Sequence, residues 1–137
     1  NNVTGVQWNA GEVAYTGTDT GIYLWKIPHD KAKAIGLFEV PGEQSSPRLG
    51  YDQPVVQIRV RGNVNSVATK ELAQSIYNEL HNLSATTFSD GTYVTVAIGE
   101  QSGPVFLGFD TNERPEFTVN VRFQIRNPTP HREAPIA

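Results

Sequence analysis

The sequence of 137 residues contains no cysteine and no methionine. Without cysteine, the chain cannot form disulfides, thiolate zinc sites or a cysteine nucleophile. No apolar run approaches the roughly 18 residues of a membrane-spanning helix, and no signal peptide is visible at the start. These absences predict a soluble protein without a membrane partner and leave its compartment open. Because the chain has no methionine and begins at Asn1, either the N-terminus was processed or further residues precede it, and we expect the second.

The charge balance also limits the possible partners. The chain carries 11 basic and 14 acidic residues, with a net charge of −3 and a pI near 5.6. Broad coating of nucleic acid depends on clustered lysine and arginine, so this balance argues against it. With 38% hydrophobic residues, the chain suits one domain, and a chain of this length typically buries about two thirds of its unfolded surface.

The segment 54–83 joins a clear strand pattern to the only convincing helix pattern. Val56, Ile58 and Val60 alternate with polar side chains, which is typical of a strand with one buried face. From Ser66 the apolar spacing changes to three and four residues, which predicts an amphipathic helix over a sheet. The apolar stripe of that helix comprises Val67, Leu72, Ala73, Ile76, Tyr77, Leu80 and Leu83.

The remaining strands are predicted from short apolar or alternating runs between turn residues. Residues 116–126 show the clearest alternation, with Phe117, Val119, Val121, Phe123 and Ile125 on one face. Another strand is predicted at residues 21–27, which are apolar on both faces. Further strands are predicted at 34–40, 92–98 and 105–109. Loops are predicted at 1–20, 28–33, 43–53 and 81–91. We therefore expect one α+β domain over residues 1–126, with a mixed, mainly antiparallel sheet of about five strands and one principal helix on one face. Residues 127–137 contain three prolines and predict an extended tail, which we expect to become ordered only against a neighbouring subunit.

No catalytic, cofactor-binding or metal site is predicted. His29, His81 and His131 lie in a turn, at a helix end and in the tail, without acidic or histidine neighbours at metal-ligand spacing. The segment 110–113 lacks the glycine and the distant glutamate of a calcium loop and is predicted to be a turn. Ser102 does not lie in a nucleophile elbow, and the chain has no phosphate-binding glycine loop.

Four arginines are predicted on the polar faces of two strands: Arg59, Arg61, Arg122 and Arg126. If these strands are neighbours, the guanidinium groups share one surface. That surface could be a solvated face, a subunit interface or a phosphate-binding face. Arginine is enriched in interfaces, and Glu100, Glu113 and Glu116, in or beside predicted turns, are the expected partners on the next subunit.

The order of short motifs over about residues 20–126 resembles the tail terminator proteins of long-tailed bacteriophages, also known as minor capsid or tail completion proteins. In that family a strand ends in Arg-Gly, a helix follows, and a Pro-x-x-x-Gly-x-Asp turn precedes an aromatic-rich strand. The matching positions are Arg61, Gly62, Pro104, Gly108, Asp110, Arg114, Phe117 and Asn120.

This resemblance implies a structural subunit of the virion tail or neck, assembled in the host cytoplasm, with no cofactor. It implies a hexameric ring that caps the tail tube, ends its polymerisation and joins it to the head. The implied partners are further copies of the chain, the tail tube protein and a head–tail connector or stopper protein, while DNA passes through without sequence-specific binding. The rival hypothesis is a monomeric module that binds a ligand or single-stranded nucleic acid on the polar sheet face. Only Tyr93 offers a stacking aromatic there, and an enzyme is disfavoured because no acid–base or metal group is apparent.

Overall fold

The computed structural model describes residues 6–8, 20–29, 32–42, 44–63 and 65–132. These residues form one helix and a nine-stranded mixed sheet, which confirms the α+β fold with one principal helix and enlarges the expected sheet of about five strands. In chain order the elements are β1 (Val6–Trp8), β2 (Thr20–Leu24), β3 (Ala34–Val40), β4 (Tyr51–Asp52), β5 (Val55–Arg61), α1 (Ser66–Leu80), β6 (Ser84–Thr87), β7 (Tyr93–Gly99), β8 (Val105–Phe109) and β9 (Pro115–Arg126).

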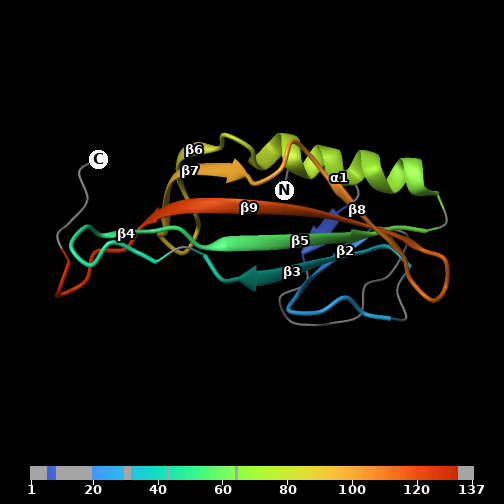
Figure 1. The fold of residues 1–137 in the computed structure, drawn as a ribbon, viewed down its shortest axis with the longest axis horizontal. Helices are drawn as coiled ribbons and strands as arrows, with labels where there is room; N and C mark the ends of the chain where they lie inside the picture. The colour runs from blue at the N-terminus through green and yellow to red at the C-terminus, as the bar shows by residue number, and fades with distance from the viewer. Residues whose placement is uncertain (1–5, 9–19, 30–31, 43, 64, 133–137) are drawn as a thin grey trace.

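The twelve-residue strand β9 organises the sheet. The main strand order is β1-β2-β3-β5-β9-β7-β6, and β4 and β8 also pair with β9. β1, β2 and β3 are parallel to one another, whereas every other pairing is antiparallel. In Figure 1, β9 crosses the centre of the molecule, with β5 and then β3 on one side and α1, β7 and β8 on the other. β9 therefore brings both halves of the chain into one sheet.

The core lies between the sheet and α1. In the register of β5 with β9, Val60 is opposite Phe117 and Ile58 is opposite Val119, so one face of this pair is apolar. Ala73 and Ile76 of α1 are buried in the same cluster. Leu72, Leu80 and Phe123 pack against it and are partly buried, which confirms the predicted contact between the helix stripe and β9.

The start of α1 and its buried face can be explained from particular residues. The side chain of Asn65 accepts a hydrogen bond from the Ala68 N–H at 3.1 Å and caps the first turn. The helix positions that face the sheet begin at Thr69, which is buried. Val67 precedes it by two residues, about 200° around the helix, and is 66% exposed, so its predicted place in the apolar stripe is wrong. Leu83 packs on the core but follows the end of the helix.

In the part of the chain that is described, no helix has the length and apolar character needed to cross a membrane.

The expected buried strand at residues 21–27 is shorter than predicted. β2 ends at Leu24, and Trp25 has a φ of 64° while its N–H donates to the Leu37 carbonyl. Leu24 and Trp25 are exposed. The chain then crosses the sheet face opposite α1, since a Cβ on Gly36 would lie 2.5 Å from Ile27. A parallel pair needs such a crossover, and hydropathy does not show where it starts.

Three segments predicted as loops contain strands. β1 occurs within residues 1–20, of which 1–5 and 9–19 lie outside the described residues. β6 occurs within residues 81–91 and pairs with β7, although three of its four side chains are exposed. An exposed edge strand needs only backbone pairing and carries little hydrophobic signal. The two-residue strand β4 also lies in the loop predicted before β5.

Candidate subunit interface

The four predicted arginines lie on one face of the sheet, opposite α1. Arg61 is across from Glu116, and Arg122 is across from Val55, while Arg126 pairs with Tyr51 of β4. Directly opposed residues share a face, and alternate residues along a strand return to it. We call this surface the arginine face, defined by Arg59, Arg61, Arg122 and Arg126.

The arginines do not form one cluster. Between Glu116 and Arg126 the chain advances ten residues, which at about 3.3 Å per residue spans roughly 33 Å. The crossover after β2 also covers part of this face, because Lys26 and Ile27 lie over Gly36. The arginine face is thus a long strip that the crossover partly covers.

Arg61 lies inside the molecule and not on its surface. It is 4% exposed, and its guanidinium donates to the carbonyl oxygens of Pro28 and Ala32 in the crossover. The expectation of a surface arginine at this position is therefore wrong. Its donors instead hold the crossover against the end of β5, because backbone carbonyls removed from water need hydrogen-bond donors.

Arg122 has partners within its own chain. Its guanidinium lies 2.9 Å from the Glu100 carboxylate and 3.4 Å from the Gln53 side-chain oxygen. Glu100, expected to bond the next subunit, is therefore paired internally. Both side chains keep about a quarter of their surface exposed, at 23% and 29%, so the pair can still border a contact.

Arg59 and Arg126 stack on aromatic rings. The Arg59 guanidinium lies 5.1 Å from the centre of the Phe38 ring, and that of Arg126 lies 4.1 Å from the centre of Tyr93. Such cation–π contacts hold the planar groups in place. Tyr93 is therefore occupied by Arg126, which weakens the case for base stacking on this face. Of the two arginines, Arg59 is exposed.

The turn between β8 and β9 is built by Asp110. Its carboxylate accepts hydrogen bonds from the backbone N–H groups of Asn112 and Arg114, both at 2.9 Å, and from Arg114 Nε at 2.7 Å. Burial alone would raise the pKa of Asp110, but these donors hold the pKa below its usual value. Glu113 in this turn is exposed with a φ of 58°, and Glu116 is half-buried.

The positions shared with the family pattern have structural roles here. Gly108 has a φ of 122° at an irregularity in the β8–β9 register, and Phe117 is buried in the core. The Asn120 carbonyl accepts the Glu100 N–H at 2.8 Å, next to the loop that leads to half-buried Pro104. Gly62 ends β5 beside the helix, and its N–H donates to the Pro115 carbonyl at 3.1 Å. These residues fix the β8–β9 hairpin and its junction with α1.

The sequence correctly predicted strand β8 but not its exposure. Val105, Phe106, Leu107 and Phe109 are 39%, 50%, 47% and 59% exposed. We call these four side chains the β8 strip. The strand pairs with β9 on one side, and no other pairing of β8 occurs in the described residues. Contiguous exposed apolar side chains mark interaction sites. The sequence signal for such a site was the run of apolar residues in β8, which does not alternate with polar residues.

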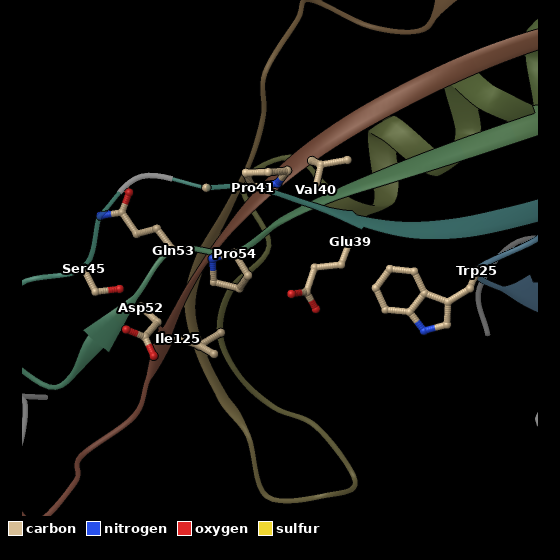
Figure 2. A pocket seen from close by; sticks show the side chains of 10 residues that line it. Trp25, Glu39, Val40, Pro41, Ser45, Asp52, Gln53, Pro54 and Ile125 are labelled. Carbon is tan, nitrogen blue, oxygen red and sulfur yellow. The ribbon is translucent and has the colours of Figure 1, made fainter.

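A hollow of about 590 Å³ lies where β3 ends and β5 begins. Figure 2 shows Trp25 at one end, Ser45 and Asp52 at the other, and Glu39 and Pro54 between them. Two carboxylates in the lining disfavour a phosphate group. The hollow therefore does not support the alternative of nucleic-acid binding.

The described part of the C-terminal tail is attached to its own subunit. Arg132 donates to the Leu49 and Tyr51 carbonyls and pairs with Asp52 at 2.9 Å. The Asn127 side chain also donates to Asp52. The expectation that the tail becomes ordered only against a neighbour is thus wrong for residues 127–132, whereas 133–137 lie outside the described residues. Prolines signalled the lack of regular structure but not the arginine anchor.

Among the described residues, no group of three or more histidine, aspartate or glutamate side chains could hold a metal ion. His81 Nδ1 accepts the Gly99 N–H at 2.9 Å, and its ring stacks on Tyr77 with 5.0 Å between ring centres. This histidine closes the gap between the helix end and β7. No histidine in this part of the chain stands in an acid–base arrangement with a carboxylate.

The family model described as bacteriophage tail terminator protein matches residues 9–127. The chain therefore belongs to the bacteriophage tail terminator family, a family of structural components of the virion that interact with other phage tail or head proteins. No curated protein sequence matches the chain.

Proposed function

We propose that this subunit forms a closed hexameric ring that caps the tail tube, ends its polymerisation and joins tail to head. The family match over residues 9–127 carries the proposal. The ring sits at the neck of the virion after assembly in the host cytoplasm, against the tail tube protein and a connector or stopper protein. DNA passes through it without sequence-specific contacts.

A head-to-tail contact between identical subunits generates either a ring or an open filament, and a protein that ends a tube must close. Such contacts are about as apolar as ordinary surface and are enriched in arginine and aromatic side chains. We propose that Arg59, Arg122 and Arg126, with Glu100, Glu113 and Glu116, lie at or near these contacts. Arg61 is left out because it is buried.

Native mass measurement of the purified chain, together with electron microscopy of purified tails, tests this function. We expect a closed ring of this subunit at the head-proximal end of the tail. Subunits scattered along the tail, or absent from it, contradict the proposal. Free protein that is monomeric does not, provided that the ring is present on the tail.

Salt and charge variants test the contact residues. Exposed ion pairs are screened within about 8 Å at physiological ionic strength, so higher salt should weaken assembly. Arg59→Glu should weaken it at low salt, whereas Lys70→Glu is the matched control because Lys70 is an exposed cation on α1. Equal effects of both substitutions would mean that net charge, and not the arginine face, controls assembly.

A further inference from the structure

Two exposed apolar surfaces lie at opposite sides of the sheet. One is the β8 strip, next to β9. The other, which we call the Trp25 corner, consists of Leu24 and Trp25, 45% and 62% exposed at the end of β2. Strands β3, β5 and β9 lie between β2 and β8, so four strand spacings of about 4.8 Å separate the two surfaces by roughly 19 Å. The two surfaces therefore cannot contact each other within one subunit, but the β8 strip of one subunit can contact the Trp25 corner of another.

Charged side chains border both surfaces. Beside the β8 strip, Glu113 lies in the β8–β9 turn and Glu116 is opposite Gly108 of β8. Next to the Trp25 corner, Lys26 follows in sequence and passes over Gly36 on the arginine face. Arg59 is opposite Gly36 on the same face, two strands from β2. Lys26 and Arg59 are both exposed, and the exposed Glu39 also lines the hollow with Trp25 (Figure 2). The part of the corner near Lys26 is therefore the part that complements the acidic border of the β8 strip. Apolar centres with complementary charged borders are typical of specific interfaces.

The β8 strip also lacks the features that protect edge strands. Edge strands are commonly blunted by a charged side chain or a proline, and β8 from Val105 to Phe109 contains neither. The Phe106 ring packs on Phe117 at 5.2 Å and on Phe109 at 5.3 Å, which holds the aromatic side chains in a fixed arrangement. The register irregularity next to Gly108 limits backbone pairing, so side chains dominate the contact.

We propose that the β8 strip of one subunit docks on the Trp25 corner of the next copy of this chain, with Glu113 and Glu116 facing Lys26 and Arg59. The inference rests on the proposed ring and names the surfaces that close it. Because the two surfaces differ, the contact is head-to-tail, as ring closure requires.

Cysteine cross-linking tests the docking directly, because the natural chain contains no cysteine. Leu24→Cys protein and Leu107→Cys protein are mixed and oxidised, both as free assemblies and on purified tails. We expect disulfide-linked dimers in the mixture that exceed those in either variant alone. A chain carrying both substitutions should give a ladder of linked subunits, whereas Val67→Cys, exposed on α1, is the control and should not link to either partner.

Charge exchange gives a second readout. Glu113→Lys and Lys26→Glu should each weaken self-association, and the double variant should restore it if the two side chains face each other. Phe109→Asp should weaken association by roughly tenfold or more, as loss of an aromatic contact residue does. Phe88→Asp is the matched control, because Phe88 is 40% exposed in the β6–β7 turn, away from both surfaces.

The outcomes separate this inference from the proposed function. Rings that form without Leu24–Leu107 cross-links, and that tolerate Phe109→Asp as well as Phe88→Asp, overturn the docking but leave the ring in place. A chain that forms no multimer either free or on tails overturns both. Cross-linked rings that Phe109→Asp disrupts establish the contact.

Discussion

Gly62 lies so close to Thr69 that a Cβ built on Gly62 would come within 1.8 Å of the Thr69 hydroxyl oxygen. That hydroxyl donates to the Asn65 carbonyl at 2.9 Å in the first turn of α1. The end of β5 and the start of the helix thus meet at a point where there is no room for a side chain. Glycine is needed here for close approach and not for an unusual φ.

Gly62→Ala should therefore destabilise the subunit. Inserting a methyl group into a packed site typically costs about 1–3 kcal/mol. Urea unfolding of the free chain measures the loss. In the double variant Gly62→Ala/Thr69→Ala, part of the stability should return because the closest atom is removed, and purely additive losses would mean that the clash is relieved elsewhere.

Arg61 and Arg59 should behave differently although they are two residues apart. Arg61→Met leaves the Pro28 and Ala32 carbonyls without their donor, and lost hydrogen bonds to charged groups cost about 1.5–3 kcal/mol each. Arg59→Met, at an exposed site, should stay within about 0.5 kcal/mol. Equilibrium unfolding of both variants checks this. Equal stabilities would mean that Arg61 does not hold the crossover.

Phe117 and Phe109 form a second matched pair. Phe117 is 7% exposed in the core, so Phe117→Ala should cost about 3–5 kcal/mol. Phe109 is 59% exposed, and its truncation should cost less than about 1 kcal/mol in the dilute, dissociated chain. Thermal unfolding at a concentration below assembly compares the two. A large loss at Phe109 would place its ring in the subunit core and not on a contact surface.

The C-terminal attachment should depend on acid. Hydrogen bonds from the side chains of Ser45 and then Asn127 lower the pKa of Asp52. Burial raises this pKa, and the hydrogen bond and positive charge of Arg132 lower it further. Because the folded-state pKa is lowered, the stabilisation is complete above the unfolded value of about 3.9 and is lost as pH falls through the folded-state pKa. The backbone N–H of Asn127 donates to the Gly50 carbonyl. Its hydrogen exchange should therefore become faster, relative to the intrinsic rate of an unprotected amide, below about pH 4.

Asp52→Asn is the control for this titration. It removes the charge at every pH, so protection of the Asn127 amide should be reduced already at neutral pH and should change little on acidification. If Asp52→Asn retains the same acid transition as the natural chain, another group is responsible.

We also expect no tightly bound metal and no catalytic activity, because the histidines and carboxylates are dispersed and cysteine is lacking. Elemental analysis after dialysis checks the first expectation. Stoichiometric zinc or calcium that survives dialysis would contradict it.

Local patterns in the sequence were enough to predict α1, the alternation of β9 and their contact in the core. Ile76 and Val119 follow periods set by helix and strand geometry, and burial of such faces is the main driving force of folding. The family resemblance rested on the same kind of local order, from Arg61 to Asn120. Strand β6 was missed because its pairing uses backbone groups that leave no side-chain pattern.

Strand and helix periodicity predicts which side chains share a face, whereas packing between distant segments sets which of them reach solvent. Arg59 and Arg61 have the same alternation, yet one is exposed and the other is buried beneath a crossover some thirty residues earlier in the chain. Phe106 is a large apolar residue of the kind that usually lies in a core, yet its side chain is 50% exposed. It is exposed because β8 lies at an edge of the sheet and pairs only with β9 among the described residues. Periodicity is a property of neighbouring residues, whereas exposure depends on which distant segment packs above each position, and this is why the contact surfaces required the fold.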